Sequence, residues 1–253
     1  MMPPIIMTSP VAHAEQPSSQ TLLTPGDYQF KTSPWSSHSR ILAYVMRWPR
    51  TARILDVGTA EGYIGQSLRR AGFTQVVGLE RDSTSAASAR ASYTEVFEGD
   101  LYWPATWAWP AGRQFDVIIC ADVLEHLRDP WSALQRLNEV LVPDGRVLIS
   151  LPNSGHWWVR LNVLCGRFPL DACGLFDRDH VRFFTWSSLH ALLRQSGLAV
   201  DRSWVTPIPF ASLRRDGAAA RLAVWSEGLY HHLARVWQRL LAYQFVLAAR
   251  RIR

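Results

Sequence analysis

The sequence predicts a single α/β domain in which a mostly parallel β-sheet is covered by helices on both faces. From Arg53 onward, short apolar segments that end in glycine or an acid alternate with segments of helical periodicity. Strands and helices that alternate at this spacing are typical of βαβ units, whose parallel strands are buried on both faces. The length of 253 residues, 48% of them hydrophobic, is sufficient for one sizeable core.

The elements are expected in a regular order along the chain. Residues 1–26 are rich in Pro, Ser, Thr and Gln and are expected to form a flexible N-terminal segment, with residues 27–253 as a single domain. Asp82 and Asp129 are suited to cap two of the helices, and Pro130 is suited to the first turn of the second. The expected strands cover residues 53–58, 75–80, 94–100, 115–122, 143–152, 197–205 and 243–250, and the expected helices cover about 61–73, 82–92, 129–141 and 218–240.

Charge and cysteine content limit the class of protein. Residues 201–253 contain nine arginines and three acidic residues, which accounts for the whole formal charge of +6. A basic segment of this kind attracts phosphates, nucleic acid or an anionic membrane, or it forms a solvated helix face. The three cysteines have no metal-ligand spacing, so we expect no metal site, no disulfide framework and a cytoplasmic location. The N-terminus lacks the basic and apolar pattern of an export signal, and no segment is long and apolar enough to span a membrane.

Acidic residues stand at the ends of the first four expected strands. Because ligands of such sheets bind beyond the carboxyl ends of the strands, these residues should border one crevice. The turn Gly58-Thr59-Ala60-Glu61-Gly62 departs from the dinucleotide pattern Gly-x-Gly-x-x-Gly, and Glu61 would repel a pyrophosphate. Glu80, 22 residues after Gly58, is placed to accept hydrogen bonds from ribose hydroxyls. The pattern favours a ribose-bearing cofactor without phosphate, although an acid that ends a strand is often only a helix cap.

Five segments resemble, in the correct order, the motifs of class I S-adenosylmethionine-dependent methyltransferases. They are ILDVGTAEGYIG, VVGLERD, FEGD, FDVIICADVLEHLRDP and LVPDGRVLISLPN, and the resemblance covers about residues 40–205. It implies a Rossmann-like, doubly wound sheet of seven strands, mostly parallel, with an antiparallel last strand beside the fifth. Ala60 stands where the family usually has the middle glycine of its loop. The resemblance implies S-adenosyl-L-methionine as the cofactor, bound by Asp56, Gly58, Ala60, Gly62, Glu80, Asp100, Leu101 and Asp122.

A long insert at about 152–184 separates the fifth strand from the next helix. Connections of this length are typically lids or binding loops. Its aromatic residues are expected either to wall a substrate site or to be buried as ordinary core; they include Trp157, Trp158, Phe168, Phe176, Phe183 and Phe184. The run GLFDRDHVRFFTWSSL resembles a signature of methyltransferases that accompany polysaccharide and glycan biosynthesis. This implies that Asp177, His180 and Arg182 are lid or substrate residues. We expect Asp177 and His180 to act in catalysis, with His126 after the fourth strand as a candidate base, and Arg160 and Arg182 to bind substrate.

These observations lead to methyl transfer to an oxygen of a small molecule, with a sugar or glycan-lipid hydroxyl as the first candidate. A quinol or other phenol, as in the ubiquinone-pathway O-methyltransferases, is the alternative acceptor, and a non-catalytic cofactor-binding partner protein is the other alternative. A nicotinamide oxidoreductase is disfavoured by the loop spacing and Glu61. No nucleic-acid partner is expected, since no stripe of basic and aromatic residues is visible.

The C-terminal helix carries apolar residues at steps of three and four, so it either packs on the sheet or lies in a membrane interface. Because a strand follows it directly, we expect it to belong to the fold and to contact anionic lipid or a lipid-linked substrate at most weakly. The apolar residues are Leu222, Trp225, Leu229, Leu233, Trp237 and Leu240.

Overall fold

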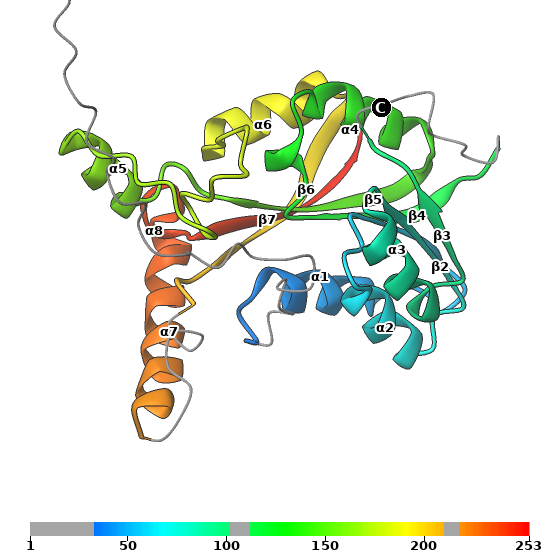
Figure 1. Cartoon of the computed structure of the whole chain (residues 1–253), viewed down its shortest axis with the longest axis horizontal. Coiled ribbons are helices and arrows are strands. Elements are labelled where there is room, and N and C mark those ends of the chain that lie inside the picture. Colours follow the sequence, from blue (N-terminus) through cyan, green and yellow to red (C-terminus); the bar gives the residue numbers. More distant parts are fainter. Residues whose placement is uncertain (1–32, 102–111, 210–217, 253) are drawn as a thin grey trace, which may run out of the picture.

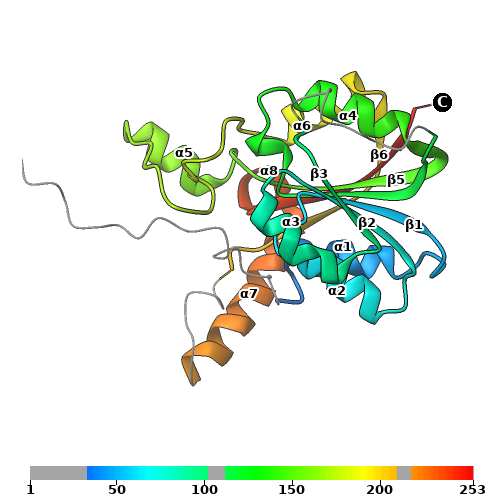
Figure 2. The same cartoon turned by 45° about the vertical axis from the view of Figure 1, so that its right-hand side comes forward.

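The computed structural model describes residues 33–101, 112–209 and 218–252, with residues 218–225 described as backbone alone. The expected N-terminal segment 1–26 lies outside these residues. A seven-stranded sheet runs through the molecule, with helices on both of its faces (Figures 1 and 2). Its strand order is β3-β2-β1-β4-β5-β7-β6. The predicted doubly wound, Rossmann-like sheet is therefore confirmed.

The first five strands are parallel, and β7 is antiparallel to both of its neighbours, β5 and β6. The predicted antiparallel last strand beside the fifth is thus confirmed. Strand boundaries agree with expectation to within two residues. The strands are β1 (Arg53–Val57), β2 (Gln75–Glu80), β3 (Glu95–Glu98), β4 (Phe115–Ala121), β5 (Leu141–Pro152), β6 (Leu198–Thr206) and β7 (Gln244–Arg251).

Helices cover the two faces of the sheet as two separate apolar cores. Asp82 and Asp129 cap α3 and α4, accepting the backbone N–H of Ser85 and Ser132. Side chains of α1, α2 and α3 pack with Ile54 on one face, and those of α4 and α6 pack with Leu55 on the other. The helices are α1 (Ser37–Val45), α2 (Tyr63–Arg70), α3 (Ser83–Ala89), α4 (Pro130–Glu139), α5 (Trp157–Leu164), α6 (Trp186–Gln195), α7 (Ala218–Val236) and α8 (Gln238–Leu241), with 3₁₀ turns at Arg90–Ser92 and Leu124–His126.

One helix ends earlier than its sequence pattern predicts. Val140 and Leu141 share the apolar face of the expected helix, but α4 ends at Glu139 and Leu141 begins β5. Leu141 pairs with Phe115 of β4, and the carbonyl of Val140 accepts the Phe115 N–H at 2.8 Å. Pairing with the neighbouring strand therefore competes with helix extension at this point and prevails.

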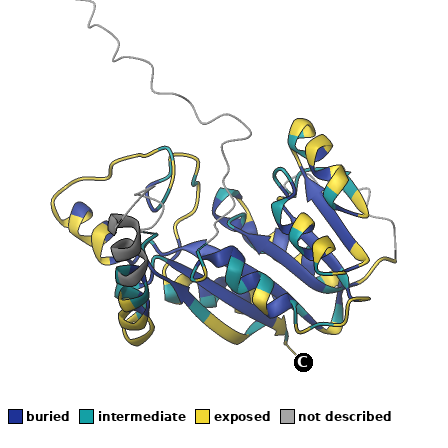
Figure 3. Ribbon diagram, turned by 90° about the horizontal axis from the view of Figure 1, so that it is seen from below, coloured by how far each residue is buried: buried dark blue, intermediate teal, exposed yellow. Residues whose placement is uncertain are grey.

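The insert and the C-terminal helix lie together at the carboxyl end of the sheet (Figures 1 and 2). Asn153 and Phe184 form an isolated bridge that closes the base of the insert. The Asn153 amide also donates to the carbonyl of Ala242, just before β7, at 2.8 Å. Figure 3 shows the sheet buried, while α5 and α7 carry exposed residues.

The apolar stripe of the C-terminal helix does not pack on the sheet. Leu229, Leu233 and Trp237 are 52%, 52% and 62% exposed, whereas Glu227 and His231 on the inner face are buried. The helix also stops at Val236, because Trp237 has non-helical dihedral angles and α8 starts after it. The side chains of Leu222 and Trp225 lie outside the described residues. None of the described helices is long and apolar enough to cross a membrane.

Candidate active site

The glycine loop between β1 and α2 takes the backbone shape that its small residues permit. Gly58, Ala60 and Gly62 all have positive φ angles of 71°, 45° and 90°. A Cβ on Gly58 would come within 2.8 Å of a methyl group of Val123, which follows β4. Ala60 tolerates the left-handed region at a cost in strain, and such strain is typical of functional turns. The loop is therefore packed from both sides and presents its backbone at the carboxyl edge of the sheet.

Glu80 holds this loop in place, which the sequence does not predict. One carboxylate oxygen, Oε2, accepts the N–H of Ala60 at 2.9 Å, and Oε1 accepts the N–H groups of Arg81 and Asp82 at 2.9 and 3.0 Å. An ionised carboxylate has about four acceptor positions, so it retains capacity for one further hydroxyl. Glu80 thus sits where the resemblance places the ribose contact, and it also positions the loop.

Asp56 lies under the loop and is 1% exposed. The hydroxyl of Tyr93 donates to Asp56 Oδ2 at 2.5 Å and accepts the Gly65 N–H at 3.1 Å. Burial raises the pKa of Asp56 to about 7; the Tyr93 bond opposes this rise and the charge of Glu80 adds to it. Oδ1 of Asp56 has no partner among the described residues, which leaves one acceptor beside the loop.

Asp122 directly follows β4 in a left-handed backbone conformation, with φ of 56°. Its Oδ1 accepts the hydroxyl of Ser150 at 2.6 Å and the side-chain amide of Gln244 at 3.0 Å. Ser150 belongs to β5 and Gln244 begins β7. Three strands therefore fix the carboxylate, and the antiparallel last strand contributes directly to the site.

Asp100 and Leu101 follow β3 at the same edge of the sheet. The N–H of Gly99 donates to the carbonyl of Glu80 at 2.9 Å, which joins the end of β3 to the end of β2. Leu101 is partly buried and packs against the core on the α4 face. The predicted cofactor residues therefore gather at the carboxyl ends of β1, β2, β3 and β4.

This crevice fits the nucleoside of S-adenosylmethionine. Its edge carries the acids Asp56, Glu80 and Asp122, a poor environment for phosphate groups. Backbone with positive φ leaves room for close approach, and Glu80 has acceptor capacity for a ribose hydroxyl. The acidic groups also suit a cofactor that carries positive charge.

Two predicted catalytic histidines lie against each other across the base of the insert. The rings of His126 and His180 have centroids 4.9 Å apart. His126 Nδ1 lies 3.0 Å from the carbonyl oxygen of Asp179. A carbonyl can only accept, so this contact places a proton on Nδ1 and leaves Nε2 of the neutral ring as an acceptor. Burial and the neighbouring His126 lower the pKa of His180, and nearby carboxylates partly oppose this shift.

Glu125 joins these histidines in a cluster that the sequence analysis missed. One ligand-type atom from each of Glu125, His126 and His180 lies within 4.8 Å of the others, so the three side chains could hold a cation. The carbonyl of Glu125 accepts the N–H groups of Val181 and Arg182, both at 3.0 Å, and ties the insert to the turn after β4. In the sequence, only the adjacent Glu125 and His126 after β4 could have indicated this cluster, because His180 is distant along the chain.

The other predicted insert residues make local contacts. Arg182 donates from Nε to the carbonyl of Arg128 at 3.0 Å and lies over the ring of Trp131. Arg160 donates from Nε to the carbonyl of Gly155 at 2.7 Å. Asp177 accepts the N–H of Asp179 at 2.8 Å within the turn that carries His180. Asp177 therefore shares the turn of the histidine pair, and the two arginines anchor separate parts of the insert.

The aromatic residues of the insert divide between core and surface. Phe184 joins the main core, and Phe176 forms a small core with Val159 and Leu175. Phe168 and Phe183 are 47% and 42% exposed and contact each other edge to face, and Phe183 also faces His180. Phe176 and Phe184 are thus buried as core, whereas a substrate wall stays a prediction for the exposed rings.

His156 links the insert to α7 and was not predicted. Its Nδ1 accepts the N–H of Trp158 at 3.3 Å, which assigns the proton to Nε2, and Nε2 donates to the hydroxyl of Tyr230 at 3.0 Å. Burial lowers the pKa of His156 to about 4, so the ring is neutral at pH 7. Tyr230 also accepts the indole N–H of Trp157 at 3.1 Å, and it thereby fixes the start of α5.

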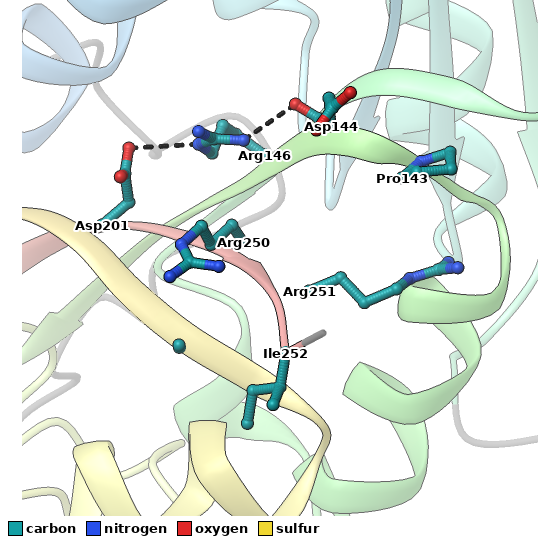
Figure 4. Close-up of a pocket in the computed structure, with 8 residues that line it drawn as sticks. Pro143, Asp144, Arg146, Asp201, Arg250, Arg251 and Ile252 are labelled. Carbon is teal, nitrogen blue, oxygen red and sulfur yellow. Dashed lines mark hydrogen bonds and ion pairs between the residues drawn. The ribbon is translucent and has the colours of Figure 1, made fainter.

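A hollow of about 550 Å³ lies elsewhere, at the opposite edge of the sheet (Figure 4). Arg146 there is paired with Asp201 at 3.1 Å and donates to the carbonyl of Asp144 (Figure 4). Arg251 is bonded to Asn138 and to the carbonyl of Leu141. Arg146 and Arg251 thus have partners within the protein, and the hollow takes no part in the crevice.

Comparison with known proteins identifies relatives that are methyltransferases. Ubiquinone biosynthesis O-methyltransferase of Aeromonas salmonicida (strain A449) is 29% identical over 164 residues, covering 63% of this chain and 68% of the relative. The enzyme of that name from Ruegeria pomeroyi is 30% identical over 154 residues, covering 59% and 61%. The chain therefore spans about two thirds of the length of these relatives.

Solved structures show the same fold. Magnesium protoporphyrin IX methyltransferase from Synechocystis PCC 6803 with bound SAH has a TM-score of 0.53 at 16% identity, covering 85% of this chain and 84% of that chain. A putative methyltransferase from Bacillus halodurans has a TM-score of 0.55 at 16% identity, covering 86% and 100%. A family model described as a methyltransferase domain matches residues 36–203, which include the glycine loop, Glu80 and the strand carrying Asp122. The chain accordingly belongs to this methyltransferase-domain family, as a class I protein with S-adenosylmethionine as its cofactor.

Proposed function

We propose that this protein methylates a hydroxyl oxygen of a small phenol-like molecule that binds between the cofactor crevice and the insert. The single observation that carries the proposal is the His126–His180 pair beside Asp122. The hydrogen bond from His126 Nδ1 to the carbonyl of Asp179 leaves Nε2 of His126 as an acceptor. Asp56, Gly58, Ala60, Gly62, Glu80, Asp100, Leu101 and Asp122 are proposed to bind the cofactor.

His126 is suited to act as the general base. Bound S-adenosylmethionine supplies an electrophilic methyl group whose carbon–sulfur bond breaks as the new carbon–oxygen bond forms. The acceptor hydroxyl must lose its proton in this step, and His126 Nε2 is the nitrogen able to take it. Burial and His126 lower the pKa of His180, which favours the neutral form of its ring, and a neutral imidazole can both donate and accept a hydrogen bond. Asp177 supports the turn on which His180 lies.

A phenol suits this site better than a sugar. The phenolic pKa is about 10, so an imidazole removes its proton more readily than that of an aliphatic hydroxyl. The exposed ring of Phe183 faces His180, and Phe168 packs edge to face against Phe183, so the two rings offer exposed apolar contact area beside the histidine. Relatives named ubiquinone biosynthesis O-methyltransferase support a phenol-like acceptor, whereas no comparison supports a sugar.

The test is a methyl-transfer assay with isotope-labelled cofactor. Purified protein is incubated with a catechol bearing an apolar side chain and, in parallel, with a glycoside of similar size, and the products are analysed by mass spectrometry. We expect a labelled methyl ether of the catechol. Cofactor binding without turnover of either acceptor would instead favour a non-catalytic partner protein, and methylation of the glycoside alone would overturn the choice of a phenol.

Variants separate a base from a structural histidine. His126→Asn should lower kcat by about 10²- to 10⁴-fold, the range for loss of a general base, with cofactor affinity within about threefold of the parent. His190→Asn is the matched control, since His190 bonds to the carbonyl of Trp186 on α6 away from the crevice.

Arg160→Gln and Arg182→Gln should raise KM for the acceptor if these arginines contact it. A chelator should leave the rate unchanged, whereas loss of activity restored by a divalent cation would assign Glu125, His126 and His180 to a metal.

A further inference from the structure

A basic pocket lies between α1, β6 and α7, apart from the crevice residues described above. Its volume is about 790 Å³. Arg40 comes from α1, while His231, His232 and Arg235 come from the inner and lateral faces of α7. Its lining includes Trp35, Arg40, Trp204, His231, Arg235 and Val236.

The polar groups of this pocket are almost all hydrogen-bond donors. Arg40 donates from Nη2 to Nε2 of His231 at 3.3 Å, because a guanidinium cannot accept. The neutral His231 ring then carries its proton on Nδ1. This Nδ1–H and the Nε–H of Arg40 are both buried and have no acceptor among the described residues. A buried N–H donor without an acceptor lowers the stability of the folded protein. The two donors are therefore placed to bind an acceptor that does not belong to the described residues.

Positive charge in the pocket is not neutralised by the lining residues. Burial, followed by Arg40, Arg235 and His232, lowers the pKa of His231 to about 4, and burial and Arg235 lower the pKa of Arg40. None of these contributions comes from a carboxylate. Glu227, one turn before His231 on α7, accepts the hydroxyl of Ser33 at 2.6 Å and is not part of the lining. The hollow at the opposite edge of the sheet differs, because its Arg146 is paired with Asp201.

Aromatic rings shape the rest of the pocket. Trp35 stacks on His231 with ring centroids 4.4 Å apart, and the guanidinium of Arg40 lies 4.9 Å from the centroid of Trp35. The neutral His231 ring and the Arg40 guanidinium are therefore held in position by the same indole ring. Trp204, Val205 and Val236 add apolar walls. Such a pocket combines a fixed charge with an apolar chamber of the size of small-molecule sites.

We propose that this pocket binds the phosphate or diphosphate group of a small molecule that has an apolar body. Two guanidinium groups match the oxygens of a phosphate in geometry and charge. The apolar body would lie against Trp35, Trp204 and Val236. Such a ligand would relieve the repulsion between Arg40 and Arg235 and would accept the unpaired N–H groups of Arg40 and His231.

The pocket is connected to the insert through adjacent residues of α7. His231 faces the pocket, and its neighbour Tyr230 accepts hydrogen bonds from His156 and Trp157 of the insert. A ligand that orders His231 would therefore also act on the residue that fixes the start of α5.

The test is calorimetric titration of the full chain with inorganic phosphate, pyrophosphate and geranyl diphosphate. We expect saturable binding of pyrophosphate and tighter binding of geranyl diphosphate. Arg235→Gln and Arg40→Gln should each weaken pyrophosphate binding by about tenfold or more, because each removes a charge-assisted hydrogen bond. Arg235 is exposed, so its substitution leaves the fold intact. Arg69→Gln, at the exposed end of α2, is the matched control and should change nothing.

Two further measurements separate a failure of the phosphate-binding proposal from a failure of the methyl-transfer proposal. Affinity for S-adenosylmethionine should be the same in all four proteins. Sedimentation with phosphatidic acid vesicles, against phosphatidylcholine vesicles, distinguishes a lipid headgroup from a free phosphate compound. Absence of saturable phosphate binding, or equal loss in Arg69→Gln, would overturn the proposal and leave water as the missing acceptor.

Discussion

Glu80 combines two functions in one carboxylate, since it holds the N–H of Ala60 and borders the proposed ribose site. In Glu80→Gln one carboxylate oxygen becomes an NH₂ group, which cannot accept from the backbone. We expect S-adenosylmethionine to bind about 10- to 100-fold more weakly, the effect of losing hydrogen bonds to a charged acceptor. Calorimetric titration measures this change. Glu98→Gln, at the exposed end of β3, is the control, and equal effects in the two variants would contradict the role of Glu80.

Asp56 should make stability depend on pH in an unusual direction. Its pKa rises from 3.8 to about 7 on folding, so between these values the native state keeps a proton that the unfolded state has lost. The free energy of unfolding therefore decreases as pH rises through this window, by up to about 4 kcal/mol from this group. Urea denaturation of the cofactor-free protein at pH 5, 6, 7 and 8 should show the decrease. Asp56→Asn should flatten it, and an unchanged slope in this variant would show that Asp56 titrates normally.

The residues that could be predicted from the sequence are those marked by local pattern. Asp56 and Glu80 stand at the ends of apolar segments, so their place at the edge of the sheet follows from strand and helix alternation. Their partners do not, because Tyr93 lies 37 positions from Asp56 and Gln244 lies 122 positions from Asp122. No local pattern in a sequence records such pairings, which arise only when the sheet is assembled.

The contact between α5 and α7 depends on one hydroxyl group. Tyr230→Phe removes the acceptor for His156 Nε2–H and for the indole of Trp157. Because His156 is buried, its orphaned donor should cost about 1–3 kcal/mol in the free energy of unfolding. Urea denaturation measures this loss, and limited proteolysis should cleave the insert faster. Tyr63→Phe is the control, since its hydroxyl bonds to Glu61 near the surface, and equal losses would show that the link is unimportant.

Strands and caps were predictable as elements, whereas the orientation of α7 was not. Asp82 and Asp129 cap helices as expected because capping depends only on adjacent residues. The apolar stripe of α7 marks one face, but periodicity does not say which face finds a partner. The face with Glu227 and His231 is buried, through contacts with Ser33 and Arg40 at the other end of the chain.

The whole sheet depends on β7, which joins β6 to the rest. Deletion of residues 207–253 removes β7, so β5 loses one neighbour and β6 loses its only one. We expect the truncated protein to be insoluble, because it exposes two long strand edges and the apolar residues above and below them. The soluble fraction and circular dichroism after expression test this. Deletion of residues 1–26 is the control and should give folded protein. A soluble, active protein without β7 would show that the C-terminal region is separate from the fold.

The position of β7 also affects how the chain folds while it is being synthesised. β6 is made before its only partner in the sheet, and Thr206 at the end of β6 precedes Gln244 at the start of β7 by 38 residues. At ribosomal rates of about 5–20 residues per second, β6 therefore waits about 2–8 s before it can pair. During this interval the edge of β5 is open to other nascent chains. An unpaired strand edge of this kind is a template for aggregation until the antiparallel strand arrives.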